Sequence, residues 1–256
     1  MEINMKLTDN TILITGGGSG IGRALAEAFH QNGNKVIIAG RRRLRLDEVT
    51  AANPGMEAIE LDLEIPADIQ NAAEQIQRDY PSLNVLINNA GIMLPDTAAG
   101  QIDDTLLTST FTTNFAAPIR LTSALMPHLK AQPQSTIIYN TSGLAFIPLA
   151  LTAVYSASKA ALHSYVMSQR FLLKDTNIDV IEIAPPWVRT ELMNSQEAEA
   201  AVPLKKFISD TMALLATEKN EIIVDEAKKF REASGPQEYE FVESFNEKMQ
   251  ALFQNG

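Results

Sequence analysis

A tyrosine and a lysine stand four residues apart in the segment YSASK, at positions 155 and 159. On a helix, that spacing puts both side chains on one face, one turn apart. A free phenol has a pKa near ~10 and is a poor acid or base at neutral pH, whereas a neighbouring ammonium favours the phenolate and lowers that pKa. A tyrosine activated by a lysine in this way can act as a proton donor. A surface tyrosine beside a solvated lysine has the same spacing, so the spacing alone does not decide between the two interpretations.

Ser142 lies thirteen residues before Tyr155, at the end of the β-branched run STIIYNTS. Ligands of doubly wound α/β sheets bind beyond the carboxyl ends of the strands, where this hydroxyl would hydrogen-bond a substrate carbonyl. A serine after a strand also commonly caps a helix or completes a turn. Each residue taken alone favours the structural interpretation, so its meaning depends on the elements that position it.

The segment TGGGSGIG (15–22) places Gly16, Gly20 and Gly22 between the apolar run TILIT and a helical pattern that ends at Gly33. Glycine lets the backbone approach a ligand closely, and the unpaired N–H groups at a helix start attract pyrophosphate. The spacing differs from the GxGxxG of the standard dinucleotide fingerprint. A tight turn that packs the helix closely is the alternative, and five glycines in eight residues favour nucleotide binding.

The second apolar run, KVIIAG (35–40), ends without the acidic residue that would bind the ribose 2′-hydroxyl of NAD. Arg41, Arg42, Arg43 and Arg45 follow instead, and guanidinium groups suit a 2′-phosphate by charge and by fork geometry. At most one or two of them can reach one phosphate, and the others would form a solvated helix face. We predict that NADP(H) is preferred over NAD(H), with Arg41 and Arg42 on the phosphate.

Strand and helix patterns alternate along the whole chain. Strands are predicted at 11–15, 35–40, 56–63, 84–91, 135–142, 178–186 and 221–224, with helical patterns between them that include 103–131 and 154–174. This rhythm predicts an α/β fold: a Rossmann-like, doubly wound parallel sheet of about seven strands in a single domain, 1–256. A substrate loop or lid is expected at about 187–204, and a C-terminal helical segment at about 225–256.

Composition narrows the function classes. The 256 residues are 45% hydrophobic and carry a net charge of -10, which disfavours nucleic acid and anionic membranes as partners. The chain has no cysteine, and His30, His128 and His163 are too scattered for metal-ligand spacing, so no metal is expected. No apolar run has the length of a signal peptide or a membrane span, which predicts a cytoplasmic protein.

As an ordered set, these motifs resemble the short form of the short-chain dehydrogenase/reductase family over almost the whole chain. TGGGSGIG matches that family's TGxxxGxG, NNAG (88–91) its fourth-strand motif, and YSASK its YxxxK. The resemblance implies that Tyr155 is the general acid in reduction, that Lys159 lowers its pKa and holds the nicotinamide ribose, and that Ser142 positions the carbonyl. It also implies that Asn114 helps to hold a proton-relay water, although a plain polar helix residue is the alternative.

The resemblance further implies a cofactor site. Asp62 would hold the adenine, with Leu63 beside it, Asn88, Ala90 and Gly91 would line the adenosine ribose, and Thr190 would bind the carboxamide. The expected cofactor-binding residues are Gly16, Gly18, Ser19, Gly20, Ile21, Gly22, Arg41, Arg42, Asp62, Leu63, Asn88, Ala90, Gly91, Tyr155, Lys159, Pro185, Val188 and Thr190.

One position departs from the family pattern. Pro186 stands where the family usually has glycine, which restricts φ and removes a donor. The PP pair and the ending EIIVDEAKKFREA resemble the subgroup named after the lipoteichoic acid D-alanylation operon oxidoreductase.

Apolar residues cluster in sequence around these motifs and predict a hydrophobic substrate pocket, although a core position is the commoner fate of Leu and Phe. The candidates are Met93, Leu144, Phe146, Leu149, Trp187, Leu192 and Met193. No arginine stands out as a carboxylate anchor, so a hydrophobic ketone, aldehyde or secondary alcohol is favoured over a small keto acid.

We therefore expect an NADP(H)-dependent carbonyl reductase or alcohol dehydrogenase that forms a homodimer or homotetramer. A dinucleotide-binding sensor without turnover is one alternative, and an activated tyrosine would serve no purpose in it. A dehydratase or epimerase would need a longer substrate domain. A 3-ketoacyl carrier-protein reductase would expose a basic docking patch, for which 187–206 offers only Arg189, Lys205 and Lys206.

Overall fold

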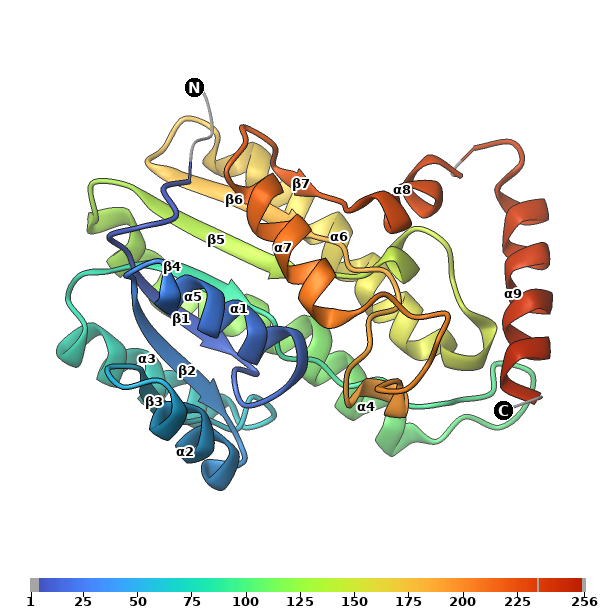
Figure 1. Cartoon of the computed structure of the whole chain (residues 1–256), viewed down its shortest axis with the longest axis horizontal. Coiled ribbons are helices and arrows are strands. Elements are labelled where there is room, and N and C mark those ends of the chain that lie inside the picture. Colours follow the sequence, from blue (N-terminus) through green and yellow to red (C-terminus); the bar gives the residue numbers. More distant parts are fainter. Residues whose placement is uncertain (1–4, 234, 255–256) are drawn as a thin grey trace.

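The computed structural model describes residues 5–233 and 235–254. Within these ranges, seven parallel strands form one sheet in the order β3-β2-β1-β4-β5-β6-β7 (Figure 1). The strands are β1 (Thr11–Thr15), β2 (Lys35–Gly40), β3 (Glu57–Glu60), β4 (Leu83–Asn88), β5 (Ser135–Asn140), β6 (Ile178–Ile183) and β7 (Glu221–Ile222). The order reverses between β1 and β4, which confirms the predicted doubly wound, Rossmann-like α/β fold.

Helices cover both faces of this sheet. The helices of the described residues are α1 (Gly20–Gln31), α2 (Arg43–Ala52), α3 (Pro66–Asp79), α4 (Asp104–Phe111), α5 (Ala117–Ala131), α6 (Ala153–Leu173), α7 (Leu204–Leu215), α8 (Asp225–Glu232) and α9 (Glu238–Gln254). A π-helical turn, η1 (Thr112–Ala116), joins α4 to α5, and 3₁₀ turns occur at η2 (Gly143–Ala145), η3 (Ala150–Thr152) and η4 (Leu192–Asn194).

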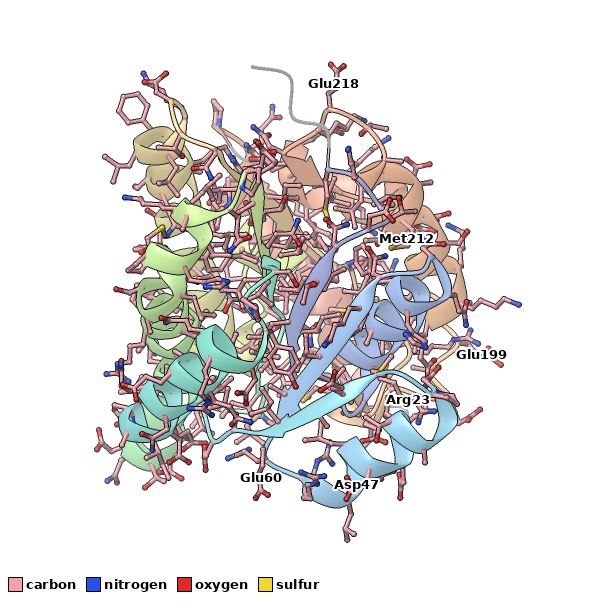
Figure 2. The ribbon with its side chains drawn as sticks, turned by 90° about the vertical axis from the view of Figure 1, so that its left-hand side faces the viewer. Arg23, Asp47, Glu60, Glu199, Met212 and Glu218 are labelled. Carbon is pink, nitrogen blue, oxygen red and sulfur yellow. The ribbon has the colours of Figure 1, made fainter. Side chains whose placement is uncertain are left out.

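Two hydrophobic cores result, one on each side of the sheet. Successive residues of β1 alternate between them: Ile12 and Ile14 join the core under α1 and α7, whereas Leu13 joins the core under α3, α5 and α6. Because both faces are buried, the central strands read as continuous apolar runs, as parallel sheets require. Charged side chains point away from these cores at the periphery of Figure 2, among them Arg23, Asp47, Glu60, Glu199 and Glu218.

Several predicted strands extend too far at their carboxyl ends. The ladder stops at Glu60, Asn88, Asn140, Ile183 and Ile222, although the apolar patterns continue to 63, 91, 142, 186 and 224. The additional residues extend past the assigned strands at the carboxyl edge of the sheet, held there by single backbone bonds such as that from the Thr141 N–H to the Ile183 carbonyl. They form the turns that carry the candidate site.

Two segments complete this edge. The expected loop at about 187–204 contains η4 and is closed by an isolated bridge between Val188 and Val202. The C-terminal segment forms α8 and α9, and α9 runs along the edge of the molecule beyond the sheet (Figure 1). Across 5–233 and 235–254, no helix is both long and apolar enough to cross a bilayer.

Candidate active site

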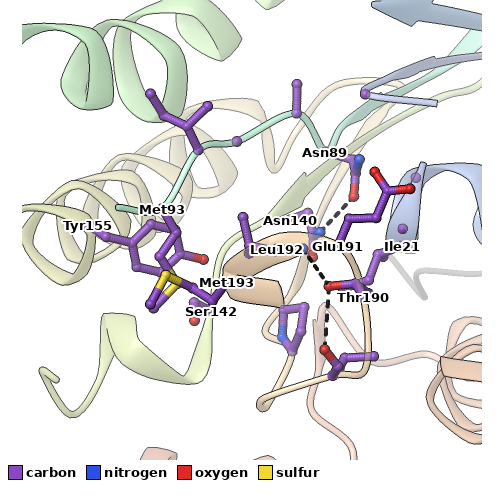
Figure 3. A pocket seen from close by; sticks show the side chains of 18 of the residues that line it. Ile21, Asn89, Met93, Asn140, Ser142, Tyr155, Thr190, Glu191, Leu192 and Met193 are labelled. Carbon is purple, nitrogen blue, oxygen red and sulfur yellow. Dashed lines mark hydrogen bonds between the residues drawn. The ribbon is translucent and has the colours of Figure 1, made fainter. Parts of the chain in front are cut away.

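A cavity of about 810 Å³ opens at the carboxyl edge of the sheet. Its wall combines the turns after β1 to β6 with residues of α8 and α9. The cavity includes the switch point between β1 and β4, where doubly wound folds bind their ligands. Figure 3 shows two ends of it: Tyr155, Ser142, Met93 and Met193 gather at one, and Ile21, Asn89 and Glu191 lie at the other.

The glycine turn after β1 lines the second end. Gly16 and Gly20 adopt φ of 69° and 53°, which favours glycine. A Cβ on Gly22 would lie 2.4 Å from the Gly16 carbonyl oxygen, so this glycine is required for the turn itself. The turn is therefore tight, as the structural interpretation of the motif requires. It also directs the N-terminus of α1 toward the cavity, where an anionic group is favoured.

Arginines surround the mouth beside this turn. Arg42 Nη2 donates to Ser19 Oγ at 3.0 Å, and Arg41 pairs with Glu64 at 2.8 Å. Arg45 also lines the cavity, and its ion pair with Glu191 is long, at 3.7 Å. These pairs are half exposed, and pairs of that kind contribute little to stability. The guanidinium groups can therefore exchange a carboxylate for a phosphate.

The side chains of Tyr155 and Ser142 are both buried and lie at the same end of the cavity (Figure 3). Tyr155 belongs to the first turn of α6, and Ser142 follows β5 and accepts a hydrogen bond from the backbone N–H of Leu144 at 3.1 Å. Burial raises the pKa of Tyr155 to about 12, and the nearby Ser142 side chain acts in the opposite direction. Among the protein groups alone, desolvation is therefore the largest effect on this pKa.

Lys159 lies one turn further along α6, as the i, i+4 spacing predicts. Its Nζ donates to the Asn140 carbonyl at 2.8 Å and stands 5.7 Å from the centre of the Tyr155 ring. Burial lowers the pKa of Lys159 to about 8, and the negative charge of Glu182 opposes that shift. The ammonium and the phenol are therefore neighbours that share one buried end of the cavity.

Asn114 lies in the π-helical turn η1 rather than in the cavity wall. Its Oδ1 accepts from the Ile92 N–H at 2.8 Å, and its Nδ2 donates to the Ile92 carbonyl at 2.9 Å and to Ser158 Oγ at 3.1 Å. A Cβ on Gly91 would lie 3.3 Å from Asn114 Oδ1 and 3.5 Å from Lys159 Nζ. Asn114 thus lies close to the lysine, and its relay role stays a prediction.

Most of the expected cofactor residues line the cavity: Gly16, Gly18, Ser19, Gly20, Ile21, Gly22, Arg41, Arg42, Asp62, Leu63, Ala90, Gly91, Tyr155, Lys159, Pro185, Val188 and Thr190. Asn88 does not, because its side chain is buried and donates to Thr122 Oγ1 at 3.0 Å. Its neighbour Asn89 takes that place and accepts from Asn140 Nδ2 at 2.8 Å (Figure 3).

The predicted substrate residues divide in the same way. Met93, Leu144, Leu149, Trp187, Leu192 and Met193 line the cavity. Phe146 lies outside its wall, and its assignment to the pocket is wrong. The chain turns at η2, so that the Phe146 ring packs edge-on against His163, with centroids 5.0 Å apart, and faces the Arg231 guanidinium at 5.2 Å.

The largest group that sequence reasoning missed comes from α8 and α9. These helices add Glu226, Lys229, Phe230, Phe245, Lys248, Met249, Leu252 and Phe253 to the cavity wall. Asn246 attaches α9 to the loop before α6, because its side chain accepts from the Ala150 N–H and donates to the Pro148 carbonyl. The amphipathic pattern of EYEFVESFNEKMQALF was the available signal, but it does not say what the apolar face covers.

The residues also fit a dinucleotide. Between Gly16 and Gly20 the turn after β1 carries a single side chain, that of Ser19, and Asn140 Oδ1 is buried with no hydrogen-bond partner among the described residues. An ordered water or a polar ligand can satisfy such an atom. The glycine turn, Asp62 and the arginines would hold the pyrophosphate and adenosine, and Lys159 with Thr190 would hold the nicotinamide end.

Comparisons with known proteins match this arrangement. Residues 10–201 match the family model described as short chain dehydrogenase. The Uncharacterized oxidoreductase DltE of Bacillus subtilis (strain 168) is 44% identical over 189 residues, 73% of this chain and 75% of that protein. The NADPH-dependent 1-acyldihydroxyacetone phosphate reductase of Schizosaccharomyces pombe is 30% identical over 216 residues, 82% of this chain and 72% of that protein.

A solved structure agrees in fold. The short chain dehydrogenase/reductase from Burkholderia phymatum, crystallised in complex with NAD, has a TM-score of 0.80 at 18% identity, over 89% of this chain and 93% of that one. The part of the chain matched by the family model ends at residue 201, so α8 and α9 lie beyond it.

Proposed function

Because this chain belongs to the short-chain dehydrogenase family and is an NAD(P)-dependent oxidoreductase, we propose that it exchanges a hydride between NADP(H) and a hydrophobic ketone, aldehyde or secondary alcohol. Tyr155 is the general acid in reduction and the general base in oxidation. The observation that carries this proposal is that the buried side chains of Tyr155, Ser142 and Lys159 line one end of the cavity, with Tyr155 and Lys159 one helical turn apart.

When bound, the nicotinamide cofactor supplies or accepts the hydride. The protein groups manage the proton on the substrate oxygen. Ser142 holds that oxygen beside the Tyr155 hydroxyl, and Tyr155 donates its proton as the carbonyl is reduced. Burial raises the pKa of Tyr155, which keeps the phenol protonated near neutral pH and ready for this step. In alcohol oxidation the same phenol must first lose its proton, so that direction requires more alkaline solution.

The preference for NADP(H) rests on charge at the end of β2. Arg41, Arg42 and Arg45 line the cavity there, and the strand ends at Gly40 with no acidic residue. Arg42 already contacts Ser19 in the glycine turn, so its guanidinium group lies within reach of a ribose phosphate. The fission yeast relative is named as NADPH-dependent, which agrees with this preference.

The preference for an apolar substrate rests on the apolar part of the cavity wall. Leu144, Leu149, Trp187 and Met193 contribute to it, together with aromatic and aliphatic residues of α8 and α9. An apolar wall of this kind removes hydrocarbon surface from water, and this favours a carbonyl compound that carries an apolar chain.

The test is to titrate purified protein with NADPH and NADH and then to assay both with aliphatic and aromatic ketones. We expect tighter NADPH binding and turnover that increases with the apolar character of the ketone. Turnover of no carbonyl, with intact NADPH binding, would favour the sensor instead. A ketoacyl thioester on carrier protein, if it were strongly preferred over the free ketones, would favour the ketoacyl reductase.

We further propose a cytoplasmic homodimer or homotetramer that pairs through α6. Three apolar side chains near the end of this helix, Met167, Phe171 and Leu172, are 43%, 65% and 76% exposed. Apolar surface of this extent on adjacent turns is typical of a protein interface. Sedimentation should show a species larger than the 28.0 kDa chain, and Phe171→Glu should dissociate it. A wild-type protein that sediments only as the single chain would contradict the pairing.

A further inference from the structure

Glu182 is a carboxylate near the carboxyl end of β6, next to the edge strand β7, and is 1% exposed. An ionised carboxylate is costly to bury unless hydrogen bonds and nearby cations compensate it. Two side chains donate to it: Thr141 Oγ1 at 2.6 Å, and His163 Nδ1 at 2.8 Å. Because an ionised carboxylate only accepts, Nδ1 carries the proton of the second bond. The carboxylate therefore ties β6 to two other elements.

These two elements, the turn after β5 and helix α6, carry the reacting groups. Thr141 stands between Asn140, whose carbonyl accepts from Lys159, and Ser142. The Thr141 N–H also donates to the Ile183 carbonyl at 2.8 Å, so the turn after β5 is held to β6 by backbone and side chain. His163 follows Lys159 by one turn on α6. Glu182 thus links the serine turn and the lysine helix through one carboxylate.

The charges around Glu182 divide into two groups. Lys159, His163 and Arg170 lie on α6, whereas Glu221 on β7 pairs with Arg231 on α8 at 3.1 Å. The Arg170 guanidinium donates to the carbonyls of Val180 and Asn220.

Glu182 and two neighbouring residues also have the side chains of a metal site. Ligand atoms of His163, Glu182 and Glu221 lie within 4.8 Å of one another, but each residue already bonds a protein group, so the contacts require no cation.

We propose that Glu182 and His163 are positioning residues for the reaction, in which the Glu182 carboxylate fixes the turn that carries Ser142 and supplies the buried negative charge that keeps Lys159 cationic. The reaction itself rests on the proposed function. Neither residue faces the cavity, so each acts through Thr141, Ser142 and Lys159. In agreement, the pKa of Lys159 is lowered by burial, and Glu182 is the group that opposes the shift.

The first test needs no substrate. Isotopically labelled lysine is followed by NMR across pH, with Lys159 assigned by its absence in Lys159→Arg. We expect the Lys159 midpoint to fall by about one pH unit in Glu182→Gln, since removal of a nearby anion disfavours the ammonium. Glu221→Gln is the matched control: it removes the same charge from the adjacent strand and should leave the midpoint in place. An unchanged midpoint in Glu182→Gln would overturn the proposal.

The second test uses turnover. Glu182→Gln should lower kcat about tenfold, leave the KM for NADP(H) within about twofold, and move the pH profile of alcohol oxidation to higher pH, because a less cationic Lys159 stabilises the phenolate less. A loss of activity with an unmoved profile would indicate a structural role only and overturn the proposal.

Two controls separate the possible failures. If Glu182→Gln does not fold, His163→Leu removes one hydrogen bond from the carboxylate and should lower the Lys159 midpoint and kcat in the same direction. If instead wild-type protein turns over no carbonyl, the proposed reaction fails while the Lys159 titration still decides the role of Glu182.

Discussion

Trp187, in the loop after β6, packs against Phe253 on α9, with ring centroids 5.7 Å apart and planes inclined by 49°. This contact joins the loop after β6 to α9, and both residues line the cavity. Phe230 on α8 continues the apolar wall, since its ring meets that of Phe245 edge-on at 5.2 Å. Because α8 and α9 lie beyond the residues matched by the family model, we expect this chain to select its substrate through them.

The contact predicts a selective loss in Phe253→Ala. For a ketone with a long apolar chain, kcat/KM should fall about tenfold, the scale of one lost apolar contact in a binding pocket, whereas a small ketone should be affected little. Tyr239→Ala is the control, because Tyr239 is an aromatic residue of the same helix that is 77% exposed and outside the cavity wall. Equal losses for large and small ketones would remove α9 from substrate selection.

Tyr155→Phe removes the transferable proton and keeps the ring. We expect kcat to fall by about 10²–10⁴, the range for loss of a general acid, while NADPH binding followed by fluorescence persists. Tyr165→Phe removes a hydroxyl from the same helix, where Tyr165 lies outside the cavity, and should retain activity. Retained turnover in Tyr155→Phe would contradict the mechanism.

Arg42→Ala should weaken NADPH binding about tenfold or more and leave NADH binding nearly unchanged, because only NADPH offers a 2′-phosphate to the guanidinium. The matched control is Arg43→Ala: Arg43 pairs with Asp47 on α2 and does not line the cavity. Isothermal titration of both cofactors measures the difference. A parallel loss for NADH would indicate that Arg42 acts through the turn rather than through the phosphate.

The buried lysine predicts a pH dependence of stability. The pKa of Lys159 falls from its ordinary value of 10.5 to about 8 on folding, so between these values the unfolded chain holds a proton that the folded chain has lost. The Lys159 contribution therefore makes the free energy of unfolding rise with pH over this window, by about 3 kcal/mol at most. Below about pH 8 both states are charged and the contribution is constant.

Urea unfolding of wild type and of Lys159→Met across this range measures that contribution as a difference. The buried tyrosines have the opposite sign, since the raised pKa of Tyr155 makes its contribution fall only above its ordinary value of 10.0. If the difference in the free energy of unfolding between the two proteins does not change from neutral pH to about pH 10, the pKa of Lys159 is not lowered by folding.

Gly22→Ala should prevent cofactor binding and destabilise the fold, because the new Cβ would lie 2.4 Å from a backbone oxygen of the glycine turn. We expect a loss of about 1–3 kcal/mol or more by thermal unfolding. In Gly100→Ala the Cβ would meet only the Thr97 side chain at 3.7 Å, an ordinary contact, and both stability and NADPH binding should persist. A stable Gly22→Ala that binds NADPH would show that the turn can yield.

Most helices and strands of the fold could be predicted from local sequence patterns. β1, β2 and α6 form where the apolar runs and the helical spacing predict them, and the glycine turn joins β1 to α1 as expected. Tyr155 and Lys159 share a helical face because i, i+4 spacing is a property of the helix alone. Asn88 and Phe146 do not line the cavity as predicted, because the direction of a side chain near the end of a strand depends on the neighbouring elements that it meets.

The sequence by itself therefore determined the order of the elements, the nucleotide turn and the spacing of the reacting groups, since each is encoded within a short segment. Tertiary structure alone decided what covers them and how they ionise. It brought Phe253 to Trp187 across 66 residues and Glu182 to His163 across 19, and it raises the pKa of Tyr155 through burial. Burial is the physical reason. The desolvation of a group depends on every element packed around it, so the sequence of a single element does not determine it.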